Sequence, residues 1–345
     1  MRIRSVLCCA IAALAAFTAT PQRASAFETG GDMSELTYEQ TTNKIIYQDS
    51  TGKTIDPIAY AKANGWTCCR LRLLVDGGSG VLGQSLNYDL ALATKIKAQG
   101  MKLILDIFYS NDWADPSQQT TPSEWKKYKY AQLTSTVQSY TASVITSFKN
   151  NGTLPDYVQV GNEISNGMLW PVGSLSNQSQ FVGLIQAGIA GVRQVSSTPK
   201  IILHCNNAQD TALVTWFYNT IASQCNYDIV GLSYYPSNGS NLAEIKTAMS
   251  AYIGLFGNRP IMLVEFGYPY DATNPYLGNS GYQNTPAGQQ QIVSDLITTM
   301  KGYTQGAGVI YWGATYASDS YGWECLFDTN TSWPKCKTEP AFGAL

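Results

Sequence analysis

The chain has 345 residues, of which only 13% are charged, and its formal net charge at pH 7 is -2. This balance provides neither the basic surface that nucleic acid binding needs nor the positive patch that anionic membranes attract. Aromatic residues reach 12%, with 22 tyrosines and 8 tryptophans, which favours a flat, uncharged ligand such as a sugar.

The first 26 residues are typical of a secretory signal peptide. Arg2 and Arg4 precede an apolar run over 6–17, and a small-residue cleavage site ends at Ala26. The run is shorter than the roughly 20 residues of a membrane-spanning helix, so an uncleaved anchor is the less favoured alternative. We therefore expect a secreted, extracellular protein with one catalytic domain over 27–345. Four N-x-S/T sequons, typical of surface loops in secreted glycoproteins, begin at Asn151, Asn177, Asn238 and Asn330.

Apolar, β-branched runs alternate with helix-compatible segments along the remaining chain, and no Pro/Ser-rich linker divides it. The expected strands are 31–34, 69–75, 102–108, 157–160, 200–203, 228–233, 260–264 and 308–311. The expected helices are 56–64, 89–99, 124–148, 178–194, 210–222, 242–255 and 286–301. Continuous apolar strands separated by helices indicate a parallel sheet that is covered on its outer face. Eight such units predict an α/β fold, a single (β/α)8 TIM barrel.

Six cysteines follow the signal peptide, and an even number in an oxidising compartment favours disulfides. The favoured bridges are Cys205–Cys225 and Cys325–Cys336, because each closes a short loop. The chain has no C-x-x-C pair, and His204 is its single histidine, so we expect no metal site of the zinc type.

Polar and aromatic side chains stand at the C-terminal ends of the expected strands, which is where TIM-barrel active sites lie. In chain order they are Arg70, Arg72, Asn162, Glu163, His204, Tyr234, Tyr235, Glu265 and Trp312. Each alone is more often a structural residue than a functional one. Their recurrence at equivalent ends of one barrel favours a shared site.

Glu163 and Glu265 both interrupt runs that otherwise demand burial, YVQVGNE and IMLVE. An unpaired buried carboxylate is costly, so each needs a partner. Arg70 can serve one of them, while tyrosine, asparagine or histidine must hold the other. This arrangement suits an ionised nucleophile beside an acid/base whose pKa is raised by burial and by its neighbour's charge. Two such carboxyl groups at the mouth of a barrel are what glycosidic bond cleavage requires.

These residues also resemble clan A of the glycoside hydrolases. Within that clan the chain resembles glycoside hydrolase family 53, the arabinogalactan endo-β-1,4-galactanases, as a divergent eukaryotic member. The matching segments run in order over 30–312 and are GGDMSEL, CRLRLLVDGG, NYDLALATKIKAQGMKLILD, YSNDWADPSQQTTPSEW, VQVGNEISNGMLWP, PKIILH, GLSYYP, VEFGYP and GVIYW. VGNEISNGMLWP and DWADPSQQT are the segments specific to the family.

The resemblance implies Glu163 as acid/base and Glu265 as nucleophile of a retaining endo-glycosidase. Its substrate would be the β-1,4-linked (arabino)galactan of pectin side chains. The substrate-binding residues that it implies are Arg70, Asn162, His204, Tyr234 or its neighbour Tyr235, Trp312, Trp113 and Trp170. No metal or organic cofactor is needed, and the enzyme is expected to act as a monomer on its polysaccharide.

Departures from the family pattern lie at strand ends. Family members usually read HYSDTWADP where this chain has FYSNDWADP, so Phe108 replaces a histidine and Asn111 an aspartate. YWGATY and HCNNAQ likewise replace YWEPAW and HLDNGW, and the calcium-binding loop of some bacterial members is not recognisable. Two alternatives therefore stay open, another β-linked polysaccharide as substrate or a carbohydrate-binding barrel with impaired hydrolysis. The segment 270–286 is expected to form a groove wall.

Overall fold

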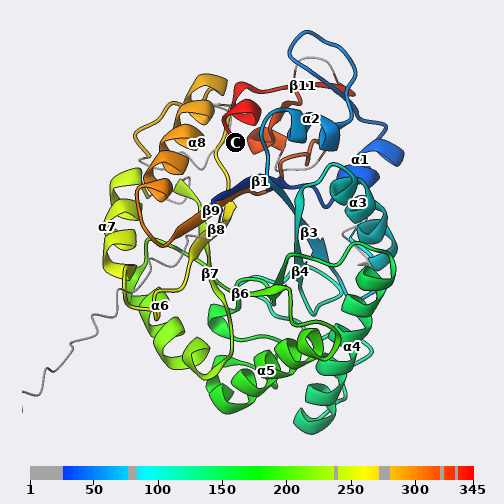
Figure 1. The fold of residues 1–345 in the computed structure, drawn as a ribbon, viewed down its shortest axis with the longest axis vertical. Helices are drawn as coiled ribbons and strands as arrows, with labels where there is room; N and C mark the ends of the chain where they lie inside the picture. Colours follow the sequence, from blue (N-terminus) through cyan, green and yellow to red (C-terminus); the bar gives the residue numbers. More distant parts are fainter. Residues whose placement is uncertain (1–25, 77–83, 237–239, 272–279, 319–321, 331–332) are drawn as a thin grey trace, which may run out of the picture.

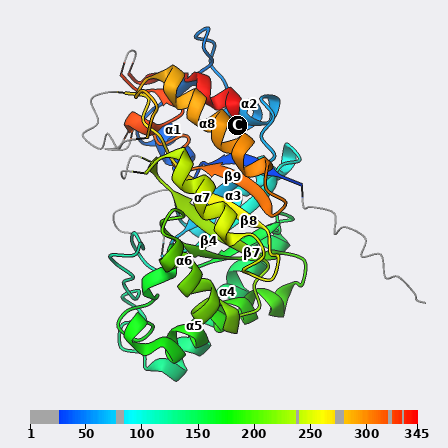
Figure 2. The same cartoon turned by 90° about the vertical axis from the view of Figure 1, so that its left-hand side faces the viewer.

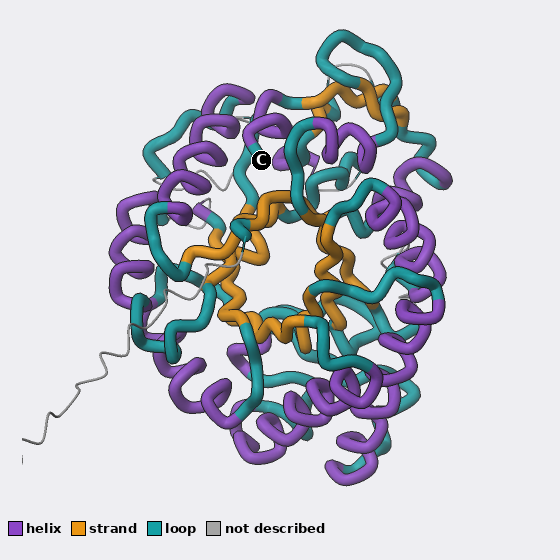
Figure 3. Tube along the Cα trace, in the orientation of Figure 1, coloured by secondary structure: helices purple, strands orange, loops and turns teal. Residues whose placement is uncertain are grey.

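Eight parallel strands close into a barrel at the centre of the molecule (Figure 1 and Figure 3). The computed structural model describes residues 26–76, 84–236, 240–271, 280–318, 322–330 and 333–345. Almost all of the predicted signal peptide, the Asn238 sequon and half of the predicted groove wall lie outside the described residues. In hydrogen-bonded order the strands are β1 (Glu28–Asp32), β3 (Cys68–Leu73), β4 (Lys102–Ile107), β5 (Tyr157–Val160), β6 (Lys200–Cys205), β7 (Ile229–Tyr234), β8 (Ile261–Phe266) and β9 (Gly306–Tyr311). The predicted TIM barrel is confirmed.

Helices form a ring around the strands (Figure 3), and the side view shows them along the outside of the barrel (Figure 2). They are α1 (Leu36–Thr41), α2 (Pro57–Ala63), α3 (Leu86–Ala98), α4 (Tyr130–Asn150), α5 (Gln178–Val195), α6 (Thr211–Trp216), α7 (Leu242–Tyr252) and α8 (Pro286–Lys301). Within the described residues, none of these helices combines the length and the apolar character needed to span a bilayer.

Several helices begin where the sequence supplies a capping side chain. Asn241 accepts hydrogen bonds from backbone N–H groups at the start of α7, and the Glu244 carboxylate accepts one from the Asn241 N–H in return. Thr285 caps α8 directly before Pro286, where a missing N–H costs nothing. The helix expected over 210–222 is less regular, because α6 ends at Trp216 and continues as a π-helical and then a 3-10 turn.

Side chains of the strands alternate between the barrel interior and the layer beneath the helices. The interior holds an apolar plug that consists of Cys68, Ile104, Tyr157, Ile202, Ile229, Met262, Val264, Ala307 and Ile310. Intervening residues such as Leu71, Leu105 and Leu203 belong to the larger core under the helices. The barrel is therefore a filled core and not a channel, so polar side chains collect only at its two ends.

A second sheet, which the sequence did not predict, lies outside the barrel. It consists of β2 (Ile46–Gln48), β10 (Phe327–Asp328) and β11 (Lys335–Thr338). β11 pairs in parallel with β2, and it lies close to α1 and α2 in Figure 1. The Trp66 and Phe342 rings stack nearby with centroids 4.7 Å apart. These contacts join segments that lie near the two ends of the described chain. Strands of two to four residues are too short to show a hydrophobic period.

The predicted disulfides Cys205–Cys225 and Cys325–Cys336 are wrong in this structure, where all six described cysteines are free and buried. Each thiol of the first pair donates a hydrogen bond to a backbone carbonyl of its own segment. Cys325 donates to the Ala314 carbonyl. Short spacing in the sequence made these pairs attractive, but bridging also requires the two Cβ atoms to face each other.

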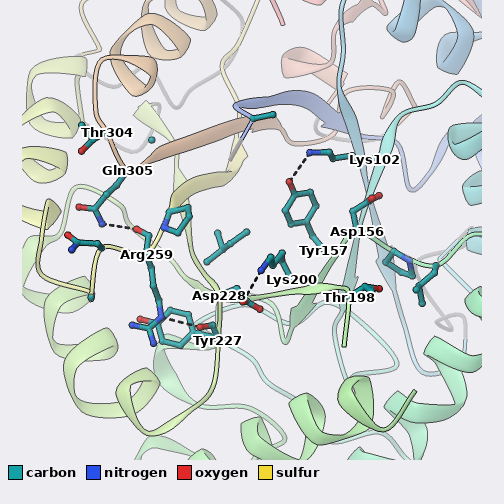
Figure 4. A pocket seen from close by; sticks show the side chains of 18 residues that line it. Lys102, Asp156, Tyr157, Thr198, Lys200, Tyr227, Asp228, Arg259, Thr304 and Gln305 are labelled. Atoms are coloured by element: carbon teal, nitrogen blue, oxygen red, sulfur yellow. Dashed lines mark hydrogen bonds and ion pairs between the residues drawn. The ribbon is translucent and has the colours of Figure 1, made fainter. Parts of the chain in front are cut away.

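A hollow of about 1140 Å³ opens at the N-terminal end of the barrel (Figure 4). Charged residues at its rim form ion pairs or hydrogen bonds with neighbouring groups. Lys200 pairs with Asp228 at 3.5 Å, and Arg259 donates to the Tyr227 carbonyl at 3.1 Å. None of the site residues predicted from the sequence is among the described residues that line it. Because TIM-barrel chemistry lies at the opposite end, we assign this hollow to the structural face.

Candidate active site

An extra residue in β8 turns Glu265 toward the barrel interior. Simple alternation would place Val264 in the interior and Glu265 beneath the helices, on the same side as Leu263. However, Leu263 pairs with Leu232 of β7, and Glu265 pairs with Ser233, the residue directly after Leu232. Val264 therefore has no partner in β7. The pairing of β8 with β9 shifts over the same residues. This β-bulge re-aims Glu265 into the mouth of the barrel.

Two donors fix the Glu265 carboxylate in one orientation. Arg70 Nη2 lies 2.7 Å from its Oε1 atom, and the Tyr235 hydroxyl donates to its Oε2 atom at 2.9 Å. The Glu265 side chain is 6% exposed, so it still reaches the surface of the mouth. A fixed, partly exposed carboxylate is suited to nucleophilic attack.

Arg70 also contacts Asp32, the last residue of β1, and Asp106, the last but one of β4, neither of which was predicted as a site residue. Asp32 lies 2.8 Å from Arg70 and 3.1 Å from Arg72, so it joins the two arginines. Burial raises the pKa of Asp106 to about 8, and the neighbouring Arg70 opposes this rise. Arg70 is thus shared among Asp32, Asp106 and Glu265.

Glu163 follows β5 in a left-handed backbone conformation, with φ 45° and ψ 48°. This conformation costs a residue with a side chain on the order of 1–2 kcal/mol. Gly161, with φ 83°, permits the turn, since a Cβ atom there would lie 2.6 Å from Ile164. The turn directs Glu163 toward Glu265, and an oxygen atom of each carboxyl group lies within 4.8 Å of the other.

A chain of hydrogen bonds holds the Glu163 carboxyl group. His204 Nε2 lies 2.7 Å from Ser233 Oγ, which donates to Glu163 Oε1 at 2.6 Å. The Nδ1 atom of the same ring faces the Gln159 amide and the Glu163 N–H. These directions assign a neutral ring with its proton on Nε2, and burial lowers the pKa of His204 well below its ordinary value. Burial and the charge of Glu265 raise the pKa of Glu163 to about 8.

The structure shows the surroundings of three predicted residues. Arg70 and His204 are completely buried, and they bond to Glu265 and to Ser233, which favours a positioning role, while their predicted contact with substrate stays a prediction. Tyr234 lies under the helices, where it stacks on Phe266 at 6.1 Å. Its neighbour Tyr235 takes the inward position and donates to Glu265, because adjacent strand residues point to opposite faces.

Asn162 is fixed from two sides. Its Oδ1 atom accepts a hydrogen bond from Arg70 at 3.0 Å, and its Nδ2 atom donates to the Ala114 carbonyl at 2.8 Å. Gln119 supports the same turn by donating to the Asn162 backbone carbonyl at 2.8 Å. Since an amide nitrogen has two N–H groups, one remains for a sugar hydroxyl, and this predicted contact stays a prediction.

Trp113 and Trp312 form an aromatic floor around Arg72, which Asp32 links to Arg70. Their ring centroids lie 6.2 Å apart, and the Arg72 guanidinium lies 4.8 Å and 5.4 Å from the two centroids. Phe108 supports this floor, since it is buried with its ring 6.0 Å from that of Trp113. Trp170 lies in the loop after β5 and is half-buried. A contact of these tryptophans with sugar stays a prediction.

Sequence reasoning missed four side chains of this site: Ser233, which donates to Glu163, and three acidic residues, Asp32, Asp106 and Glu324. Ser233 and Asp106 stand on the inner faces of strands, where a period-2 count would have found them. Glu324 lies in a short 3-10 turn after β9, where no periodic signal exists.

Glu163, His204 and Glu265 each bring a potential metal-binding atom within 4.8 Å of the others. However, both nitrogens of His204 and both oxygens of Glu265 already take part in hydrogen bonds or an ion pair. The trio is therefore better suited to proton transfer and nucleophilic attack than to holding a cation.

Known proteins show the same combination of fold and sequence. The model of glycosyl hydrolase family 53 matches residues 28–339. The chain is 33% identical to the probable arabinogalactan endo-β-1,4-galactanase A of Aspergillus tubingensis, over 88% of this chain and 90% of that protein. It is 32% identical to the arabinogalactan endo-β-1,4-galactanase A of Aspergillus niger, over 84% and 86% respectively. A GH53 catalytic domain from Ignisphaera aggregans superposes with a TM-score of 0.84 at 28% identity, covering 92% of this chain and 95% of that one.

Proposed function

Because the chain belongs to glycosyl hydrolase family 53, we propose that it is an endo-β-1,4-galactanase that cleaves internal linkages of (arabino)galactan with retention of configuration. The approach of Glu163 and Glu265 to within 4.8 Å carries the proposal. Carboxyl groups about 5 to 5.5 Å apart are typical of retaining glycosidases, whereas inverting enzymes separate them by about 6.5 to 9.5 Å.

In the first step, Glu265 attacks the anomeric carbon of a galactosyl unit. The bond from that carbon to the glycosidic oxygen breaks, and protonated Glu163 donates its proton to the departing oxygen. The product of this step is a galactosyl ester of Glu265. Arg70 and Tyr235 hold the Glu265 carboxylate in one orientation, so the carboxylate needs little reorientation before it attacks.

In the second step, Glu163 changes from acid to base. Ester formation removes the charge of Glu265, which is one cause of the raised pKa of Glu163. The pKa of Glu163 therefore falls in the intermediate, and its carboxylate can accept a proton from water. The resulting hydroxide attacks the anomeric carbon, and Glu265 leaves as a carboxylate.

Substituting Ser233 with alanine tests how the acid is controlled. The Ser233 hydroxyl donates to Glu163 at 2.6 Å, and this hydrogen bond lowers the pKa of the carboxyl group. Without it the acid form should persist to higher pH. We expect the alkaline limb of kcat/KM on galactan to move upward by about one pH unit at most. A limb that moves downward, or does not move, would contradict the assigned direction of this hydrogen bond.

We also propose that the protein is secreted and glycosylated. The N-terminal segment with its cleavage site at Ala26 supports export. Three sequon asparagines, Asn151, Asn177 and Asn330, are exposed and leave room for a glycan. Mass spectrometry of protein from the culture medium would test both points, because it reads the mature N-terminus and the mass at each sequon.

The proposed activity is tested on linear β-1,4-galactan. We expect a rapid fall in polymer length, which indicates internal cleavage, with products whose first-formed anomer is β by proton NMR. Mannan, xylan and β-glucan serve as parallel substrates. Cleavage of one of these instead would reassign the substrate, and no cleavage of any would contradict the enzyme. A first-formed α anomer would contradict retention.

A further inference from the structure

A third carboxyl group, that of Glu324, occupies the active-site mouth beyond the nucleophile. After the bulge in β8, Glu265 points inward, Phe266 points toward the helices and Gly267 points inward again. A Cβ atom on Gly267 would lie 2.7 Å from Glu324 Oε2 and 3.1 Å from Tyr235 Cε1. The Glu324 carboxyl group therefore fills the side-chain space that Gly267 leaves empty, on the same face of the strand as the nucleophile.

This carboxyl group has no counter-charge. Within the described part of the chain, Glu324 makes no ion pair or side-chain hydrogen bond, although the residue is only 3% exposed. Asp106, which is equally buried, is paired with Arg70. The hydrogen-bonding capacity of the Glu324 side chain is therefore not used by the described protein residues, and a ligand in the mouth can use it.

We propose that Glu324 is a substrate-binding residue, which as a neutral acid donates a hydrogen bond to a hydroxyl group of the sugar unit held above Glu265. The inference rests on the proposed galactanase function and names a further contact of the same site. A sugar hydroxyl is a suitable acceptor because it supplies the missing partner without bringing a charge.

The neutral form follows from the surroundings. Burial and the charge of Glu265 raise the pKa of Glu324 to about 8. The titratable groups that face it are Glu265 and Tyr235, and Asp106 lies beyond Arg70. Bound sugar displaces water and strengthens repulsion between two carboxylates, so the complex should favour protonated Glu324. Affinity should therefore fall as pH rises through about 8.

The experiment measures β-1,4-galactotetraose binding by calorimetry between pH 6.5 and 9. It is done in the Glu163→Gln background, which removes hydrolysis and the titration of the acid. From pH 7 to 9 we expect the affinity of this variant to fall about ten-fold more than that of Glu163→Gln/Glu324→Gln. Titration of Asp106 would change the affinity of both proteins in the same way, so it does not affect the difference between them. Equal pH dependence in the two proteins would overturn the inference.

Three further variants in the same background separate binding from folding. Glu324→Ala should bind about ten-fold more weakly at pH 7, whereas Glu324→Gln, which still donates, should stay within a few-fold of the parent. Gly267→Ala keeps the Glu324 side chain but should also weaken binding, because the added Cβ atom displaces the Glu324 carboxyl group. Glu339→Gln, a matched control at a buried carboxyl group outside the site, should leave the pH dependence unchanged. Failure of the parent to bind galactotetraose at any pH would instead reject the proposed substrate.

Discussion

Replacing Glu265 with alanine is expected to lower kcat on β-1,4-galactan by about 10⁴-fold or more, because no group remains to form the covalent intermediate. Arg70, Tyr235 and the bulge that hold the carboxylate are separate from it, so the variant should keep its fold. Initial rates of reducing-end release measure the loss, and the melting temperature controls for folding.

Rescue by azide distinguishes the loss of a nucleophile from a general disruption of the active site. In Glu265→Ala a small anion can enter the vacated space and attack an aryl β-galactobioside from the same side as the missing carboxylate. We expect azide to restore turnover and to yield an α-galactosyl azide. A β-galactosyl azide, or residual activity within ten-fold of the parent enzyme, would show that another group is the nucleophile.

Replacing Glu163 with alanine is expected to lower kcat on galactan by about 10²- to 10⁴-fold, the usual contribution of general acid–base catalysis. The loss of kcat/KM should be much smaller for a dinitrophenyl galactobioside, whose leaving group needs no proton. In the parent enzyme the acid form is required, so activity should decline as pH rises through the raised pKa of Glu163, about 8.

The alkaline limb is the second measurement for Glu163. It should disappear in Glu163→Ala, because no proton donor is left to titrate. Azide attacks the galactosyl intermediate from the side that Glu163 served, so it should now give a β-galactosyl azide. Equal losses on galactan and on the activated substrate would contradict the role of Glu163 as acid.

The sequence was most informative about the barrel. Eight apolar runs alternate with longer, helix-compatible segments along the chain. Because this alternation recurs so often, an error at the boundary of one element does not change the predicted fold. The sheet of β2, β10 and β11 could not be found in this way, since its strands have two to four residues. The disulfide predictions failed because spacing along the chain does not report the direction of a side chain.

The site was predictable where burial and charge conflict. Glu163 and Glu265 interrupt apolar runs, and a buried carboxylate needs a partner or a function whatever the exact backbone geometry. The sequence left Tyr234 and Tyr235 open, and the face that each occupies at the end of β7 had to be known before Tyr235 could be identified as the partner of Glu265. The left-handed turn at Glu163 depends on local backbone geometry that periodicity does not contain.

Residues that depart from the family pattern modify the support of the sugar floor. Phe108 is buried beneath Trp113, and Asn111 accepts a hydrogen bond from the Ser123 N–H on the surface. Among the described residues, neither forms a hydrogen bond or an ion pair with Glu163 or Glu265. Phe108 therefore changes the support of Trp113, whereas Asn111 belongs to a surface turn, and the carboxyl pair is retained.

The unpaired Val264 has a consequence for how such an enzyme can arise. A strand with strict alternation would send the carboxylate at 265 to the wrong face, among the helices. With one residue fewer or one more between Leu263 and the glutamate, regular alternation alone would direct the carboxylate into the barrel, and no bulge would be needed. The face that this carboxylate occupies is therefore set by the spacing of residues along β8 as well as by their identity.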